Sequence, residues 1–315
     1  MLQRCWAHDY CAPCFYLITV VTEPRRECLG VLTTGDGIEP VVKLSPAGEV
    51  VREVWRRTSA VYAGVEACEC VVMPDHFHGI LWVKERLARP VGHVIKAFKR
   101  VSEQECRSRG LLLPPDPGTV PAAASAAGSL TLWQTGFQDS ILLRRGQLKA
   151  MARYIADNPR RLAVKRANPA LFTVVANLEI APGRTCAAIG NRFLLERPLK
   201  RQVQVSRRIS PDALAAEQTA LLDAADHGAV LVSPCISPGE KAIARAALAA
   251  GRPLIVLLAN GFAPLYKPTG RYFDACAAGR LLMIAPFPYC RQRQPITRTQ
   301  CLELNALAER IASCA

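Results

Sequence analysis

The stretch Val71-Val72-Met73-Pro74-Asp75-His76-Phe77-His78-Gly79-Ile80-Leu81-Trp82 contains two apolar runs separated by a Pro-Asp pair. Short apolar runs rich in β-branched and aromatic residues are typical of strands, and Pro-Asp is typical of a turn. The stretch therefore predicts two neighbouring strands, 65–72 and 76–83, joined by a tight connection. Because successive side chains of a strand point to opposite faces, His76 and His78 should share one face, while Phe77 should enter a core on the other.

Two imidazoles side by side on a strand can form a bidentate metal site. A His-x-His pair also occurs by chance, so a purely structural role is the alternative for this stretch taken alone. A second motif, much further along the chain, supports the metal hypothesis.

The composition indicates a globular, strongly basic chain. It has 315 residues, of which 50% are hydrophobic, and a formal net charge of +14. This length allows two domains, and the charge predicts attraction to polyanions, with nucleic acid as the first candidate and an acidic membrane surface as the alternative. No run of residues has the length and apolar character of a spanning helix, and Met1 to Trp6 lacks a signal-peptide pattern. We therefore expect a cytoplasmic protein without a membrane partner.

Thirteen cysteines occur through both halves of the chain. In a chain without a secretion signal they are expected to be reduced thiols, several of them in the core. Cys5, His8, Cys11 and Cys14 have a spacing that could suit zinc. However, Cys14 begins a strand-like run, and four ligands so close in sequence rarely complete a tetrahedron, so reduced thiols are favoured over zinc.

Three segments have the apolar spacing of helices. The first, 45–62, has Ser45 as a candidate N-cap before Pro46, and the second, 90–107, has Lys96, Lys99 and Arg100 on one face. The third, 147–158, should end at Pro159, because the residue before proline avoids helical geometry. The alternative for the basic face is an ordinary solvated surface.

The third helix carries a possible functional pair, since Tyr154 and Asn158 are one turn apart and share a face. A half-buried structural tyrosine is the alternative for Tyr154. The remaining segments are a strand at 14–22, a hairpin or irregular excursion at 30–43, and a short strand at 138–143. Leu113 to Gly128 is rich in Pro, Ala and Gly, which predicts a flexible surface insertion.

Together, Met73 to Gly79, the basic helix with Phe98-Lys99, residues 133–143 and Tyr154-Ile155-x-x-Asn158-Pro159 resemble the REP-associated tyrosine transposases. These are insertion-sequence-type transposases of the HUH (His-hydrophobic-His) superfamily. The resemblance covers about residues 10–175 and implies an α+β domain with a ferredoxin-like antiparallel sheet. The expected order of strand, helix, strand, strand, helix, strand and helix fits that fold. The 113–128 insertion departs from the compact members and puts hairpin specificity in doubt.

The resemblance also implies roles for individual residues. Tyr154 would be the nucleophile that forms a 5′-phosphotyrosine, while His76, His78 and Asn158 would hold a divalent ion. Family precedent indicates Mg²⁺, and Mn²⁺ would suit the histidines. The DNA would be single-stranded, often a hairpin, and a set of basic residues would contact its phosphates: Lys96, Lys99, Arg100, Arg160, Arg161, Lys165 and Arg166. Trp133 or Phe137 could stack on unpaired bases, with core packing as the alternative.

Beyond Phe172 strands alternate with helices, which predicts an α/β, Rossmann-like parallel sheet over 201–315, after a linker over 176–200. The expected strands are 203–207, 229–233, 253–258 and 280–285, and the expected helices are 211–227, 238–250, 272–278 and 298–312. This order resembles the core of DNA-processing protein A, a single-strand-binding recombination mediator.

Ser206-Arg207, Val232-Ser233 and Asn260-Gly261-Phe262 would lie at carboxyl ends of strands, where open parallel sheets bind ligands. Val205 and Pro234 stand where glycines are usual, so the ligand of this second domain stays open. A structural or partner-binding appendage is the alternative.

The sequence favours a two-domain, metal-dependent tyrosine transposase that cleaves and rejoins single-stranded DNA. The alternatives are a non-catalytic DNA-binding protein and a metal-dependent hydrolase in which Tyr154 is structural. The combination of His76, His78, Tyr154 and Asn158 favours the enzyme, because a binding protein does not need all four residues.

Overall fold

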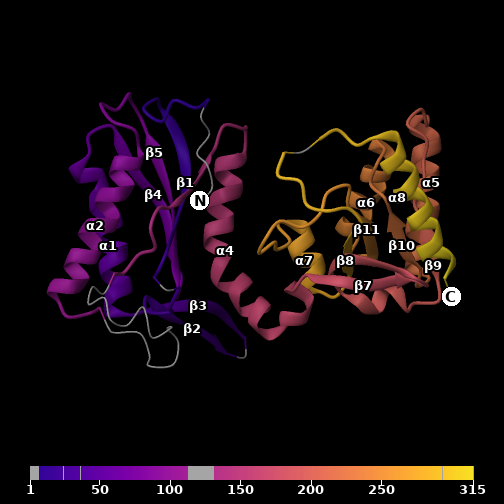
Figure 1. Cartoon of the computed structure of the whole chain (residues 1–315), viewed down its shortest axis with the longest axis horizontal. Helices are drawn as coiled ribbons and strands as arrows, with labels where there is room; N and C mark the ends of the chain where they lie inside the picture. Colours follow the sequence, from indigo (N-terminus) through magenta and orange to yellow (C-terminus); the bar gives the residue numbers. More distant parts are fainter. Residues whose placement is uncertain (1–6, 24, 36, 113–130, 293, 315) are drawn as a thin grey trace. The chain divides into compact units, whose positions relative to one another are not determined.

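The computed structural model describes residues 7–23, 25–35, 37–112, 131–292 and 294–314, and the chain divides into two compact units, Met1–Ala163 and Val164–Ala315 (Figure 1). The predicted insertion from Leu113 to Gly128 lies outside the described residues, as does Cys5 of the candidate zinc cluster. No helix in the described ranges combines the length and the apolar composition needed to cross a bilayer.

The first unit is built on an antiparallel sheet with the strand order β4-β5-β1-β6. Its strands are β1 (Cys14–Val21), β4 (Val65–Val72), β5 (His76–Val83) and β6 (Gln138–Ile141), and β2 (Gly30–Gly35) with β3 (Ile38–Leu44) forms a separate hairpin. The strands predicted from the apolar runs are confirmed, including the pair on either side of Pro74-Asp75. β5 is a central strand of this sheet, paired on both sides, so its side chains are held in a fixed register.

Helices α1 (Pro46–Val61) and α2 (Gly92–Ser108) cover one face of this sheet, and α4 (Gln147–Ala167) packs on the other (Figure 1). α1 begins where the sequence predicts, because the Ser45 hydroxyl accepts a hydrogen bond from the Gly48 N–H at 3.1 Å and Pro46 occupies the first turn. Alternate side chains of β5 therefore enter two different cores, Phe77 and Leu81 the one under α1 and α2, and Ile80 the one under α4.

The larger core is centred on aromatic rings from three elements. Trp55 of α1 lies 4.9 Å from Phe77 of β5 and 5.3 Å from Phe98 of α2, between ring centroids. The Trp55 indole N–H donates to the Cys68 carbonyl at 3.2 Å, so its polar atom is satisfied. Gly79 makes room for this indole, since a Cβ there would lie 2.6 Å from a Trp55 ring carbon. On the α4 side, a smaller cluster contains Leu17, Ile80, Leu142 and Ile155.

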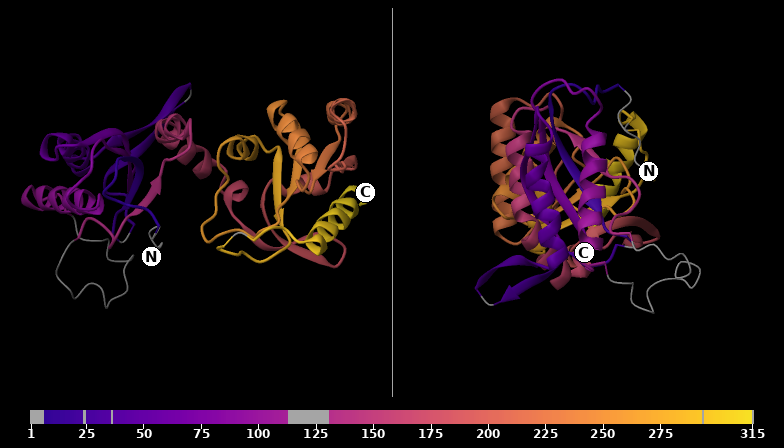
Figure 2. Two further views of the ribbon diagram at one scale, coloured as in Figure 1. Left: turned by 90° about the horizontal axis from the view of Figure 1, so that it is seen from above. Right: turned by 90° about the vertical axis from the view of Figure 1, so that its left-hand side faces the viewer.

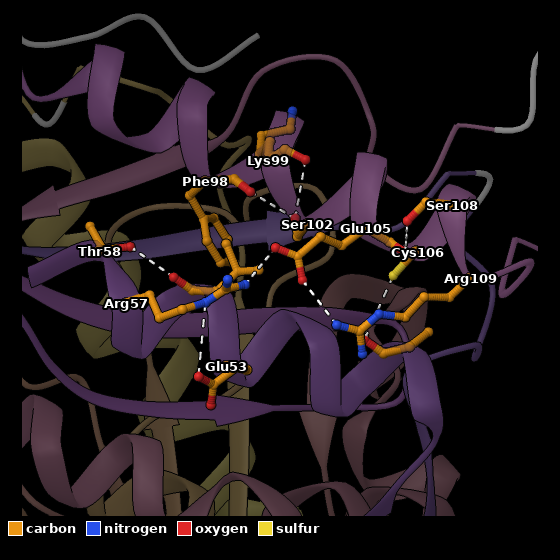
Figure 3. Close-up of polar contacts among 12 residues, drawn as sticks. Glu53, Arg57, Thr58, Phe98, Lys99, Ser102, Glu105, Cys106, Ser108 and Arg109 are labelled. Atoms are coloured by element: carbon orange, nitrogen blue, oxygen red, sulfur yellow. Dashed lines mark hydrogen bonds and ion pairs between the residues drawn. The ribbon is translucent and has the colours of Figure 1, made fainter. Parts of the chain in front are cut away.

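A group of surface ion pairs includes one that joins α1 to α2. Arg57 pairs with Glu105 of α2 at 2.5 Å and with Glu53 of its own helix at 3.8 Å, and Arg109 approaches Glu105 at 3.4 Å (Figure 3). Exposed pairs of this kind contribute about 0.2–1 kcal/mol each. The aromatic core, and not these pairs, therefore provides most of the contact energy between the two helices and the sheet.

The prediction that the third helix stops at Pro159 is wrong, because α4 continues through Pro159 to Ala167. A proline in a helix removes one N–H, here the donor for the Ile155 carbonyl, but it does not prevent the following residues from remaining helical. Packing of Ile155 in the small cluster and burial of Asn158 and Arg161 fix the helix on both sides of the proline.

The second unit contains a mixed, mostly parallel sheet with the strand order β7-β8-β12-β11-β10-β9. Its strands are β7 (Val175–Ala181), β8 (Arg184–Gly190), β9 (Lys200–Gln202), β10 (Val230–Ser233), β11 (Leu254–Leu257) and β12 (Leu281–Ala285). Its α-helices are α5 (Pro211–Asp226), α6 (Pro238–Ala249), α7 (Arg271–Ala277) and α8 (Arg298–Ser313), with single 3₁₀ turns η1 (Pro169–Phe172) and η2 (Arg192–Leu195).

Helices cover both faces of this second sheet. α5, α6 and α7 pack on one face, against residues such as Leu231, Val256 and Met283. α8 packs on the other face against Val232, Ile255 and other residues of the same strands, and Figure 2 (left) shows α8 in yellow across the sheet from α5 and α6. The alternation of strands and helices predicted a parallel sheet for this region, and β9 to β12 are parallel.

The predicted linker over 176–200 is a second correction. These residues include β7 and β8, which form an antiparallel hairpin, and β8 pairs with β12. The first parallel strand also lies earlier than expected, at Lys200–Gln202 in place of 203–207. Both errors arise because pairing with strands far along the chain decides which short segment becomes a strand.

Candidate active site

His76 and His78 lie next to each other on the α4-facing side of β5. Their ring centroids are 4.7 Å apart, and Phe77 between them is fully buried in the opposite core, as strand alternation predicts. His78 is 7% exposed and the His76 side chain is 17% exposed. The pair is therefore held on a rigid central strand at a partly buried position.

Each imidazole is oriented by a partner at its Nδ1 atom. Asp75 Oδ1 lies 2.5 Å from His76 Nδ1, and Thr19 Oγ1 of β1 lies 2.8 Å from His78 Nδ1. Thr19 is opposite His78 in the β1–β5 register, which explains the contact. When Nδ1 carries the proton in such contacts, Nε2 is the nitrogen that can bind a metal.

Asp75 is also held by Arg25, whose Nε donates to Asp75 Oδ2 at 2.8 Å. Burial raises the pKa of Asp75, but the hydrogen bonds from His76 and Arg25 outweigh it and hold this pKa well below its ordinary value. Asp75 is therefore a carboxylate at neutral pH. It places a negative charge behind the histidine pair without needing to be a ligand itself.

α4 brings Tyr154 and Asn158 to the same side of the sheet. The Tyr154 ring lies edge-on to His78, with centroids 5.6 Å apart, and is half-buried against the small cluster of Leu17 and Ile80. Asn158 is 7% exposed, and its Nδ2 donates to the Tyr154 carbonyl at 2.7 Å. This bond leaves Oδ1 as the atom of Asn158 that could bind a cation.

Arg161 adds a positive charge next to Tyr154. Its guanidinium carbon is 5.6 Å from the centre of the Tyr154 ring, and the residue is only 8% exposed. Asp157 lies 3.9 Å from Arg161 and forms a closer pair with Arg160, at 2.5 Å. The structure therefore places Arg161 beside the phenol, whereas the sequence suggested only a general contact to phosphates.

The residues present fit a divalent ion. Two imidazoles with partners at Nδ1 and one amide oxygen form a mixed N/O donor set, and borderline ions such as Mn²⁺ accept such sets. Among the described residues, no group of three or more His, Cys, Asp or Glu side chains is placed to hold a metal. Metal binding by His76, His78 and Asn158 stays a prediction from the sequence.

The predicted DNA contacts are distributed over different parts of the structure. Lys96 and Arg100 are exposed on α2. The Lys99 ammonium instead donates to the carbonyls of Gln134 and Gly136, at 2.5 and 2.6 Å, and burial lowers its pKa. Lys99 thus fixes the segment before β6, in place of the phosphate contact that the sequence predicts. Lys165 and Arg166 belong to the second unit, beyond the part of α4 that carries the site.

The aromatic residues considered for base stacking are part of the first unit's core. Trp133 is 5% exposed, and its indole N–H donates to Ser102 Oγ at 3.0 Å. Phe137 is partly buried against the same core. The alternative of core packing is therefore correct for Trp133.

The sequence did not identify the two residues that orient the histidines. Asp75 was assigned only to the turn, although its position directly before His76 was a usable signal. Thr19 is a polar residue in an otherwise apolar run, but its importance depends on the pairing of β1 with β5, which the sequence does not reveal.

The second unit has a separate cavity of about 560 Å³ at the carboxyl ends of β9 and β10. Its lining includes Ser206 and Arg207, which the sequence singled out, together with Arg298 and Asn305 of α8. The buried Glu240 also lines it, but its carboxylate accepts the N–H groups of Ile236 and Ser237 and so caps α6. A cavity at this edge is what a parallel sheet predicts, and we assign no ligand to it.

No protein-family model matches this chain. An uncharacterised protein of Haemophilus influenzae is 23% identical over 172 residues, which cover 48% of this chain and 83% of that protein.

Two solved structures are similar to about half of the chain each. A REP-associated tyrosine transposase bound to a REP hairpin has 14% identity and a TM-score of 0.35, with 51% of this chain and 74% of that chain covered. DNA-processing protein A from Helicobacter pylori, whose structure concerns its single-stranded DNA binding mode, has 20% identity and a TM-score of 0.34, with 44% and 65% covered. At these identities and TM-scores, neither similarity decides the activity of this chain.

Proposed function

We propose that this chain is a metal-dependent enzyme that cleaves and rejoins single-stranded DNA, hairpin DNA in particular, through a covalent phosphotyrosine at Tyr154. The observation that carries the proposal is the position of Tyr154, whose ring lies 5.6 Å from the ring of His78 while Asn158 extends from the same helix. The contact between Tyr154 and His78 supports a site between α4 and β5, with His76 next to His78 and Asn158 one turn from Tyr154 as the further candidates.

We also propose finer fold assignments for the two units. The strand order β4-β5-β1-β6, with two helices on one face, supports a ferredoxin-like first unit. Four consecutive parallel strands, β9 to β12, connected by helices support a Rossmann-like second unit.

In the proposed reaction the Tyr154 oxygen attacks phosphorus and the bond from phosphorus to the 3′ oxygen breaks. The phenol proton leaves to solvent, the departing 3′ oxygen takes up a proton from solvent and is released as a 3′ hydroxyl, and the 5′ phosphate stays on the tyrosine. A bound divalent ion would supply Lewis-acid neutralisation of the phosphodiester oxygens. Because the phosphotyrosine replaces one ester bond by another, the reverse attack by a 3′ hydroxyl rejoins the strand without a nucleotide cofactor.

Other residues of the site would bind the ion, orient its ligands and stabilise the charge that develops in the reaction. His76, His78 and Asn158 would bind the ion, and Asp75 and Thr19 would keep the two imidazoles in the ligating orientation. Arg161 is a positive charge beside the ring, suited to stabilise negative charge that develops near the phenol oxygen. The small cluster under α4 holds Tyr154 against the histidines.

The direct test is an adduct assay with the full chain. The protein is incubated with single-stranded hairpin DNA labelled at its 5′ or 3′ end, with Mn²⁺ or Mg²⁺, and separated on a denaturing gel. We expect a protein–DNA adduct that retains the label on the 3′ side of the cut and that disappears with a chelator or in His78→Ala. Cleavage without an adduct would support the hydrolase alternative, and binding without cleavage would support the DNA-binding alternative.

Removing the carboxylate behind His76 should weaken metal binding. Asp75→Asn keeps the size of the side chain but removes the charge that holds the Nδ1 proton, and loss of such a partner typically costs about 10–100-fold in metal affinity. The measurement is titration with Mn²⁺ followed by electron paramagnetic resonance of the free ion. Asp9→Asn is the matched control, since Asp9 pairs with the exposed Arg86 at 2.8 Å. Equal Mn²⁺ affinities of the two variants would show that Asp75 does not contribute to metal binding.

A further inference from the structure

A groove of about 650 Å³ lies on the side of the first unit that α1 and α2 cover. It is lined by the end of α1, by residues 87–89 and by the first half of α2. α1 and α2 pack on the Phe77 side of the sheet, while His78 and Tyr154 lie on the α4 side. The groove is therefore distinct from the candidate active site and on the opposite face of the same sheet.

The charged side chains that line this groove are all basic. Arg89, His93, Lys96 and Arg100 line it, and no carboxylate is among the described residues that do so. All four side chains are exposed, and the three on α2 follow the spacing of one helical face. An anionic partner would meet several cations here without meeting a repulsive charge.

Three arginines of α1 and α2 that lie outside the groove form ion pairs. Arg52 pairs with Glu49, Arg57 with Glu105, and Arg107 with Glu103, and Figure 3 shows the Arg57 contact between α1 and α2. By contrast, within the described ranges Arg89, Lys96 and Arg100 form no hydrogen bond or ion pair. Among the described cations of α1 and α2, Arg52, Arg57, Lys99 and Arg107 have partners, whereas Lys96 and Arg100 have none and line the groove. Within the same described residues Arg56 of α1 also has none, but it lies outside the groove.

The rest of the lining is apolar and includes an aromatic ring. Tyr62 at the end of α1 is half-buried, Val61 is 70% exposed, and Val94 of α2 contributes to the floor. An aromatic or apolar wall facing a row of cations is the arrangement that binds unpaired nucleotides, with bases on the ring and phosphates on the cations. A double helix would instead hide its bases from such a wall.

We propose that this groove, formed by Tyr62, Arg89, Lys96 and Arg100, is a second binding site for an unpaired segment of polynucleotide. The inference rests on the proposed function for the choice of DNA over RNA, which share the phosphodiester and base chemistry. The protein would then contact its substrate on both faces of one sheet, with cleavage on one face and retention on the other.

The test measures binding separately from chemistry. Tyr154→Phe protein is used as the background, and fluorescence anisotropy follows unpaired DNA and RNA oligonucleotides over a range of salt concentrations. The groove variant is Lys96→Gln with Arg100→Gln. The matched control is Arg52→Gln with Arg107→Gln, which removes the same charge from paired positions on the same two helices.

We expect the groove variant to bind DNA on the order of tenfold more weakly, with a salt slope reduced by about 1.4 for two lost phosphate contacts, and the control to change little. Tyr62→Ala should weaken binding on the order of tenfold with an unchanged salt slope, because a stacking contact is lost. Stronger binding of RNA than of DNA would reassign the polynucleotide and contradict the choice of DNA.

Equal loss in the groove variant and the control would overturn the proposal, because only net charge would then matter. This outcome is distinguishable from failure of the proposed function, which would appear as absence of an adduct in the wild-type chain. Binding of anionic lipid vesicles that depends on Lys96 and Arg100, without binding of oligonucleotides, would also overturn it. Because Lys96 and Arg100 are exposed, we expect the variants to fold normally, and circular dichroism checks this.

Discussion

Tyr154→Phe is expected to abolish the covalent protein–DNA adduct while leaving DNA binding and metal binding essentially intact. The substitution removes one oxygen and keeps the ring that packs near His78 and under Arg161. Without that oxygen no tyrosine ester can form at this position, so the loss should be complete rather than graded. The measurement is the denaturing gel assay, with anisotropy on the same DNA and Mn²⁺ titration as parallel readouts.

Tyr10→Phe is a suitable control for this experiment. Tyr10 is also half-buried and packed against aromatic partners, but it belongs to the core on the α1 and α2 side of the sheet. It should form the adduct at the wild-type level. An adduct that persists in Tyr154→Phe would show that another residue is the nucleophile, and the assignment of α4 as the catalytic helix would fail.

Trp55→Ala is expected to lower the free energy of unfolding of the first unit by about 3–5 kcal/mol, the usual cost of removing a buried tryptophan. Trp55 is fully buried, and it contacts Phe77, Phe98 and the space above Gly79. The cavity left behind would remove the packing on one side of β5, directly opposite the histidines. Metal affinity should therefore fall together with stability.

Urea denaturation followed by tryptophan fluorescence measures this effect selectively. All four tryptophans of the chain, Trp6, Trp55, Trp82 and Trp133, precede Val164, so the signal reports on the first unit. Trp82→Ala is the control, because Trp82 is half-buried and stacks on Phe15 at 5.1 Å. Its loss should be clearly smaller, and equal losses in the two variants would contradict the central role of Trp55.

Sequence reasoning succeeded where local rules decide the structure. The placement of His76 and His78 on one face follows from strand alternation, and the start of α1 follows from the hydroxyl of Ser45 next to Pro46. The four-residue spacing of Tyr154 and Asn158 likewise defines one face of a helix. These features involve residues within a few positions of one another.

Sequence reasoning failed where distant segments decide the structure. Thr19 and His78 are 59 residues apart, and only the β1–β5 register brings them together. β8 becomes a strand through β12, which lies far along the chain, so residues 184–190 looked like part of a linker. Lys99 has the helical spacing of a phosphate contact, but its ammonium donates to the carbonyls of Gln134 and Gly136, 35 and 37 residues along the chain.

The shared use of β5 by core and site has a consequence for how this chain can vary. Even-numbered positions carry His76, His78 and Ile80, and odd-numbered positions carry Phe77 and Leu81. Inserting or deleting one residue within this strand would exchange the two sets, burying imidazoles against Trp55 and turning Phe77 towards α4. Only insertions or deletions of an even number of residues in this strand would keep both the Phe77 core and the paired histidines on their present faces.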